Sequence, residues 1–112
     1  MSAPRLNRKL VLEGAVRSPD GAGGFTEAWV ALGEVWGEVT ARTGRERAES
    51  GVPVSAVSYR IVVRAAPVGA PSRPGPDQRF REGARLFVIQ AVAERDPEGR
   101  FLTCFADEEV AA

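Results

Sequence analysis

Glycine and proline interrupt this chain so often that long helices are disfavoured over most of its length. The 112 residues include 12 Gly and 8 Pro, and both residue types weaken or break the interior of a helix. Between these interruptions, apolar residues alternate with polar ones, which is the pattern of a strand with one buried face. The sequence therefore predicts short antiparallel strands that are joined by turns.

The alternating segments predict about six strands. The pattern is clearest in 57–65, where every second residue from Val57 to Val63 is apolar or aromatic. Residues 26–38 also fit a helix, but Gly33 and Gly37 each weaken a helix by about 1 kcal/mol relative to Ala. The expected strands are 9–16, a return strand that starts near Phe25 or Trp29, 34–40, 57–65, 79–81, 85–92 and 101–106.

A sheet of short antiparallel strands must hide its edges, and closure into a small barrel or sandwich does so. We therefore predict an all-β fold, a small antiparallel β-barrel that forms one domain over residues 1–112. Two long loops are expected, at about 41–56 and at 66–78. The first is polar and poor in large apolar residues, and the second holds four of the eight prolines. The acidic tail 107–112 is expected to be frayed.

The alternation also predicts which side chains face the core. In the first strand, Leu10, Leu12 and Val16 are expected to point inward, whereas Lys9 and Glu13 point outward.

Composition disfavours several classes of function. Fifteen basic residues balance fifteen acidic ones, which argues against a protein held to nucleic acid by bulk positive charge. The chain has no His and one Cys, so we expect no catalytic constellation, no metal site and no cofactor. Cys104 is interpreted as a buried structural thiol. No run of about 20 apolar residues could cross a membrane, and the N-terminus lacks an apolar signal core, which predicts a protein made in the cytoplasm.

Five stretches follow one another across residues 5–106. They are Leu6 with Lys9-Leu10-Val11-Leu12; Asp20-Gly21-Ala22-Gly23-Gly24-Phe25 with Trp29; Val35-Trp36-Gly37-Glu38-Val39; Gly44-Arg45-Glu46; and Tyr59-Arg60-Ile61-Val62-Val63-Arg64 with Gly83-Ala84-Arg85-Leu86-Phe87-Val88-Ile89. In this order and spacing they resemble the phage head–tail joining proteins, the head-closure or stopper family. Tyr59 stands where that family often has His, Gly37 stands where Ala is commoner, and the segment 66–78 is longer than in the family.

The resemblance implies a structural role rather than an enzymatic one. Such proteins form a ring, of six or twelve copies, below the portal and its adaptor; the ring closes the DNA channel and receives the tail. Gene transfer agents keep the same part. The expected partners are thus other copies of the chain, adaptor and portal proteins, tail terminator or tail tube proteins, and DNA that passes without sequence specificity, all within a virion-like particle.

In that family the loop after the second main strand reaches toward the central channel, and here this loop corresponds to about 41–56. Its Arg42, Arg45 and Arg47 are therefore candidates for facing DNA. The alternative is a solvated loop in which Glu46 and Glu49 form local ion pairs, each of which contributes little to stability.

Trp36 is a candidate interface residue, because the alternation places it on the same face as Glu34 and Glu38. Trp is enriched at interfaces. The alternative, for Trp29 as well as Trp36, is that the indole fills the barrel or covers one of its ends.

Three arginines complete the candidate interface. Arg60 and Arg64 share one strand face, and Arg85 is expected alongside them. They would meet an acidic neighbour, such as Glu34 or Glu38, across a subunit boundary. A solvent-facing sheet surface is the alternative.

A different class of function stays open, namely a small β-barrel that binds single-stranded nucleic acid. Such a module needs a basic groove with exposed aromatic side chains. Zero net charge and an aromatic content of 7% count against it.

Overall fold

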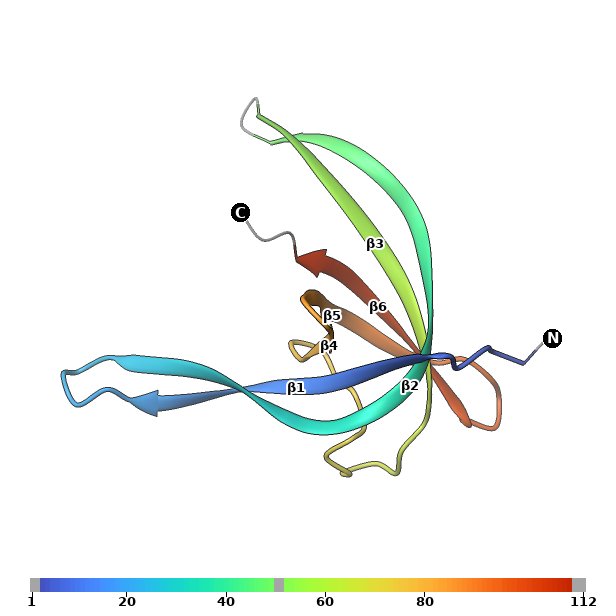
Figure 1. Ribbon diagram of the computed structural model, residues 1–112, viewed down its shortest axis with the longest axis horizontal. Coiled ribbons are helices and arrows are strands. Elements are labelled where there is room, and N and C mark those ends of the chain that lie inside the picture. The colour runs from blue at the N-terminus through green and yellow to red at the C-terminus, as the bar shows by residue number, and fades with distance from the viewer. Residues whose placement is uncertain (1–2, 50–51, 110–112) are drawn as a thin grey trace.

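Six antiparallel strands close into a barrel in the computed structural model, which describes residues 3–49 and 52–109, and the side chains of these residues outside 43–56 (Figure 1). The strands are β1 (Arg8–Pro19), β2 (Phe25–Glu49), β3 (Val52–Arg64), β4 (Arg79–Glu82), β5 (Arg85–Glu94) and β6 (Phe101–Glu109). Their order around the barrel is β1-β2-β3-β6-β5-β4. Three residue pairs between β1 and β4 close the ring. The predicted all-β fold is confirmed, and the described residues contain no helix that could cross a membrane.

The interior of the barrel is filled by side chains from all six strands. The inward positions alternate along each strand, so neighbouring strands contribute residues to the same layers. Leu10 and Leu12 are fully buried, as the alternation predicted. The residues of the core cluster are Leu10, Leu12, Ile61, Val63, Phe80, Phe87, Ile89, Leu102, Cys104 and Ala106.

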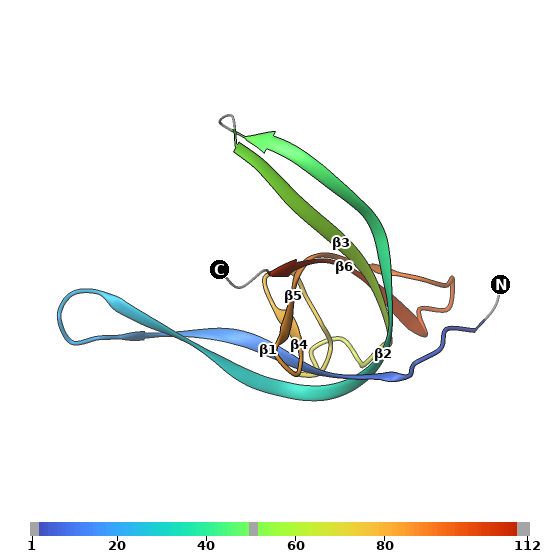
Figure 2. The same cartoon turned by 45° about the horizontal axis from the view of Figure 1, so that its top comes forward.

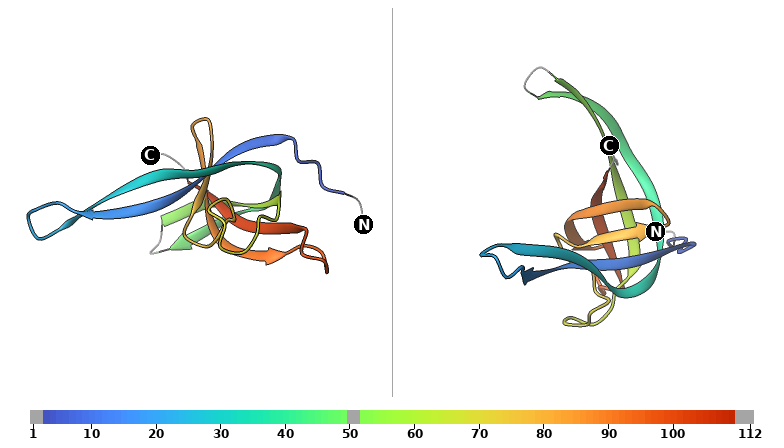
Figure 3. Two further views of the ribbon diagram at one scale, coloured as in Figure 1. Left: turned by 90° about the horizontal axis from the view of Figure 1, so that it is seen from below. Right: turned by 60° about the vertical axis from the view of Figure 1, so that its left-hand side comes forward.

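Two hairpins extend beyond the barrel, and we call them the first arm and the second arm (Figures 1 and 2). The first arm, residues 14–30, joins the ends of β1 and β2, which pair with each other from Gly14↔Val30 to Pro19↔Phe25. The second arm joins the end of β2 to the start of β3, from Gly44↔Val57 to Glu49↔Val52. Further views show that the two arms leave the barrel in different directions (Figure 3).

The strand β2 takes part in both arms and in the barrel wall. Its first half pairs with β1 and its second half with β3, and Gly37 pairs with both Arg8 and Val63. A Cβ atom at Gly37 would lie 3.0 Å from Leu10 Cδ1 and 3.2 Å from the Val62 carbonyl oxygen. The close approach of the two neighbouring strands therefore explains why glycine occupies this position.

The predicted loop at 41–56 is wrong, because β2 continues to Glu49 and β3 begins at Val52. The prediction relied on the lack of large apolar residues in this segment. In a hairpin, however, each strand satisfies the backbone donors and acceptors of the other without a buried face. Positions 50 and 51 lie outside the described residues. The segment 66–78 does form turns and irregular structure without a strand, as predicted.

The acidic tail is not frayed over its first three residues, because β6 extends to Glu109, which pairs with Leu86. The remaining residues, 110–112, lie outside the description. Val16 is another correction: it is exposed, because β1 leaves the barrel at Gly14 and continues into the first arm.

Glu13 is buried although it lies on the outer face of β1. Only 6% of it is exposed, since its carboxylate oxygens accept hydrogen bonds from Arg79 Nε at 2.8 Å and Arg81 Nε at 2.9 Å. Both arginines belong to β4, so this cluster joins the two strands that close the barrel. Burial alone would raise the pKa of Glu13, but the hydrogen bonds from Arg81 and Arg79 hold that pKa below its ordinary value.

We predict that Glu13→Gln lowers the free energy of unfolding by about 2–3 kcal/mol at pH 7, because it leaves two arginines without their carboxylate. A carboxylate whose pKa is lowered by folding stabilises the protein above its unfolded pKa, and this contribution is lost as the pH falls through the folded pKa. The difference between the wild type and the variant should therefore shrink below about pH 4. Urea unfolding at pH 7 and pH 3 measures it, with the exposed Glu27→Gln as control. An equal difference at both pH values would contradict this role for Glu13.

Candidate interaction surfaces

The outer face of β2, β3 and β6 combines arginine and aromatic side chains. Cross-strand register places Arg64 opposite Phe101, and Arg60 opposite Phe105. The guanidinium of Arg64 lies 5.6 Å from the centre of the Phe101 ring, and that of Arg42 lies 5.1 Å from the centre of the Phe105 ring. We call this surface the arginine–aromatic face; its members are Trp36, Arg42, Arg60, Arg64, Phe101 and Phe105.

Trp36 is the most exposed aromatic side chain on this face. It is 54% exposed, so the prediction that it lies at the surface is confirmed. A shallow pocket of about 230 Å³ beside it is also lined by Leu6 and Arg64. An indole beside an arginine on an open sheet face is typical of protein interfaces.

Arg42, Arg60 and Arg64 have no carboxylate partner among the side chains that the structure describes. The glutamates proposed as their partners are engaged within the chain. Glu34 pairs with Lys9 at 3.0 Å, and Glu38 accepts a hydrogen bond from the Arg5 backbone at 2.9 Å. The three arginines are therefore available for acidic groups on another molecule.

Arg85 does not lie with Arg60 and Arg64, which corrects the predicted cluster of three. Its Nε donates to Glu108 Oε2 at 2.8 Å and its Nη2 to Tyr59 Oη at 3.2 Å. Arg85 also lies 4.9 Å from the centre of the Phe87 ring. Hydrogen bonding from Arg85 lowers the pKa of Glu108. The alternation could not reveal this, because the partner comes from the acidic tail that was expected to be frayed.

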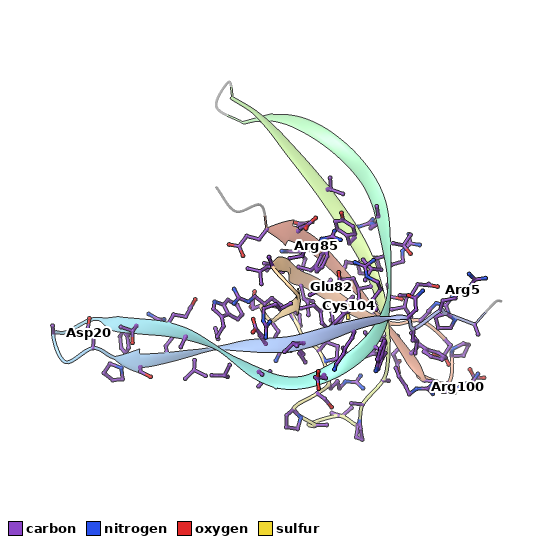
Figure 4. The ribbon with its side chains drawn as sticks, viewed as in Figure 1. Arg5, Asp20, Glu82, Arg85, Arg100 and Cys104 are labelled. Carbon is purple, nitrogen blue, oxygen red and sulfur yellow. The ribbon has the colours of Figure 1, made fainter. Side chains whose placement is uncertain are left out.

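A second ion pair continues this network at the same end of the barrel. Arg8 of β1 binds Glu82 of β4, and Glu82 lies near Arg85, 4.0 Å from its Nη1 (Figure 4). Hydrogen bonding from Arg8 lowers the pKa of Glu82. These contacts join β1, β4, β5 and β6, so we assign Arg85 to the fold rather than to an interface.

The three candidate channel arginines lie on one strand instead of in a loop. Arg42 is exposed and lies where the second arm leaves the barrel. Arg45 and Arg47 pair with Ala56 and Val54 in the ladder of the second arm. The side chains of Arg45 and Arg47 are outside the part of the chain whose side chains are described.

The first arm carries exposed apolar residues that the sequence analysis did not single out. Phe25 is 61% exposed, and Val16 and Val30 are exposed as well. The guanidinium of Arg17 lies 4.9 Å from the centre of the Phe25 ring. The segment 17–25 was interpreted as a turn-rich loop, and its glycines concealed the strand residues on both sides of the turn.

Hydrogen bonds hold the tip of the first arm in one conformation. The Asp20 carboxylate accepts hydrogen bonds from the backbone N–H groups of Ala22, at 2.8 Å, and Gly24, at 3.0 Å. These bonds lower the pKa of Asp20. Gly21 and Gly23 have φ values of +81° and +85°, which only glycine adopts easily. Figure 4 shows Asp20 far from the barrel.

Trp29 and Cys104 have structural positions. Trp29 is half-buried outside the barrel, where Arg79 lies 4.0 Å from its ring centre, so it packs on the Glu13 cluster and does not fill the core. Cys104 is fully buried, and burial raises its pKa to about 12. Its predicted role as a buried thiol is confirmed. Within the described part of the chain, no three His, Cys, Asp or Glu residues are grouped as metal ligands would be.

Comparisons with known proteins place these surfaces in context. A family model described as phage head completion protein matches residues 1–109. A chain in the solved structure of the virion of a native gene transfer agent particle shares 65% sequence identity with this one; the match covers 98% of this chain and 100% of the other, with a TM-score of 0.84. A comparison with curated proteins found no match.

The different roles of Arg85 and Arg60 can be measured. Arg85→Ala should lower the free energy of unfolding by about 1 kcal/mol, a value reduced by partial exposure, because it leaves Glu108 without its donor. Arg60→Ala should change it by no more than about 0.5 kcal/mol, because this exposed residue has no described carboxylate partner. Urea unfolding of both variants at pH 7 gives the comparison. A larger loss for Arg60→Ala than for Arg85→Ala would reverse the assignment.

Proposed function

The chain belongs to the phage head completion protein family, and we propose that it is a structural protein of the junction between the head and the tail of a phage-like particle. In this proposal several copies form a ring between the adaptor of the portal and the tail, and DNA passes through the ring. The relative that is 65% identical to this chain is part of a gene transfer agent virion, which supports a location in such a particle.

The observation that carries this proposal is the combination of one closed barrel with two strand-built arms that point in different directions (Figure 2). A monomer has no use for two hairpins without a core of their own, since each exposes both faces to water. A subunit in a ring can use them to reach a neighbour and a channel. The arginine–aromatic face provides a further surface for a partner that carries acidic groups.

We assign the second arm to the channel. It holds Arg42, Arg45 and Arg47 within six residues of one strand. Repetition around an axis would turn a small local charge into a positive collar, to which the DNA backbone is attracted without sequence preference.

Binding of single-stranded nucleic acid is the other candidate, and the arginine–aromatic face is the observation that favours it. Bases would have to stack on the aromatic rings. Arg64 and Arg42 already lie over Phe101 and Phe105, and the chain has no net charge. The face therefore suits a protein partner better than a nucleic acid strand.

The channel role predicts the phenotype of a triple variant, Arg42→Ser, Arg45→Ser and Arg47→Ser. Substitution of solvated side chains should change stability by only about 0.5 kcal/mol per site. The variant should therefore melt normally and enter particles normally, whereas the particles should leak DNA or fail to deliver it. Thermal unfolding, particle composition and DNA transfer measure the three properties.

Arg100→Ser is the matched control, because Arg100 is exposed and lies away from the second arm (Figure 4). It should leave DNA retention and delivery unchanged. If the triple variant folds, assembles and transfers DNA like the wild type, the channel role of the second arm is wrong. If it melts much earlier, the arginines belong to the fold.

A further inference from the structure

The tip of the first arm presents an aromatic side chain in a fixed position. Phe25 is 61% exposed at the end of a ladder that is paired up to Pro19↔Phe25. The Asp20 turn holds the two strands together, so little conformational entropy remains to be lost when Phe25 binds. Arg17 lies over the ring and forms no ion pair with any side chain that the structure describes.

The base of the same arm contains an apolar pocket with one acidic residue at its edge. Its volume is about 390 Å³, and its lining includes Gly14, Val16, Val30, Leu32, Pro76 and Asp77. A cavity of about 150 Å³ already accommodates a benzene ring, so this pocket is large enough for a phenyl group. A Cβ atom at Gly14 would lie 2.9 Å from Leu32 Cδ1, which shows that the pocket wall is closely packed there.

Asp77 is held at the pocket edge in an unusual backbone conformation. Its φ is +70°, the only positive value for a non-glycine residue among those described. Its backbone N–H donates to the Ile89 carbonyl at 3.1 Å, which ties the proline-rich segment to β5. No described side chain donates a hydrogen bond to its carboxylate. Backbone strain of this kind is often found at functional sites.

Phe25 cannot reach the pocket of its own chain. Phe25 and Leu32 lie on the same strand, seven positions apart, which corresponds to roughly 23 Å at about 3.3 Å per residue. Both strands of the arm are paired over this distance, so the arm cannot fold back. The tip and the pocket can therefore be joined only between two molecules.

We propose that Phe25 of one copy binds in the pocket of the next copy, where Arg17 of the first copy pairs with Asp77 of the second. Charge complementarity selects a second copy as the occupant, because the tip offers an unpaired cation beside the aromatic ring and the pocket offers an unpaired carboxylate beside the apolar lining. The contact is head-to-tail: each copy has one tip and one pocket, so it repeats until a ring closes. This inference rests on the proposed function, and it names the contact that holds the ring together.

A cysteine pair tests the contact inside assembled particles. Phe25→Cys and Val30→Cys in one chain place a thiol at the tip and another in the pocket. An intrachain disulfide is excluded, since five extended residues separate the two positions by roughly 16 Å, beyond the limit of about 7 Å between Cα atoms. The native Cys104 is fully buried and does not compete.

After mild oxidation, particles that carry the double variant should give a ladder of covalent oligomers on a non-reducing gel. Particles with either single variant should give monomers only. The proposal is overturned if the double variant is present in particles but stays monomeric, if Phe25→Cys alone forms dimers, or if it crosslinks to a different particle protein.

Charge exchange is the second test. Arg17→Asp and Asp77→Arg should each reduce incorporation into particles at least tenfold, and the double variant should restore it, with normal melting of all three chains. Val68→Ala is the control, because Val68 is the most exposed of the large apolar residues. No rescue in the double variant, or normal incorporation of both single variants, would overturn the proposal. Absence of the wild-type chain from particles would instead refute the proposed function.

Discussion

The pairing of β2 with two different partners is the constraint on which the rest of the structure depends. One strand of 25 residues begins in the first arm, crosses the barrel wall and ends in the second arm. The change of partner takes place at Gly37, where Arg8 and Val63 flank the same residue and a side chain would contact Leu10 and the Val62 carbonyl. The barrel thereby fixes the positions from which both arms project.

The closure of the barrel is short and depends on polar contacts. Only Val11, Leu12 and Glu13 pair with β4, so few backbone hydrogen bonds join these strands. Glu13 with its two arginines, and Arg8 with Glu82, add charged contacts across the same seam. The functional surfaces lie elsewhere, since the arginine–aromatic face is on β2, β3 and β6 and the arms project from the wall. Assembly can therefore use these surfaces without opening the barrel.

The sequence predicts the part of the fold in which alternation and burial coincide. Leu10, Leu12, Ile61 and Val63 were expected in the core and are buried there. The arms were not predicted, because a hairpin stabilised by backbone pairing has no buried face to impose a pattern. Arg85 was misplaced for a different reason: its partner Glu108 is distant in sequence, and alternation carries no information on pairing between distant segments.

The central claim is that this chain is a ring-forming subunit at the head–tail junction, with its second arm directed into the DNA channel. Electron microscopy of particles that contain the chain tests this most directly, by locating the barrel and both arms in the density. The account predicts a closed ring of barrels between head and tail, in which each first arm contacts the adjacent copy and the second arms line the channel. Barrels located in another part of the particle, or second arms on the outer surface of the ring, would contradict it.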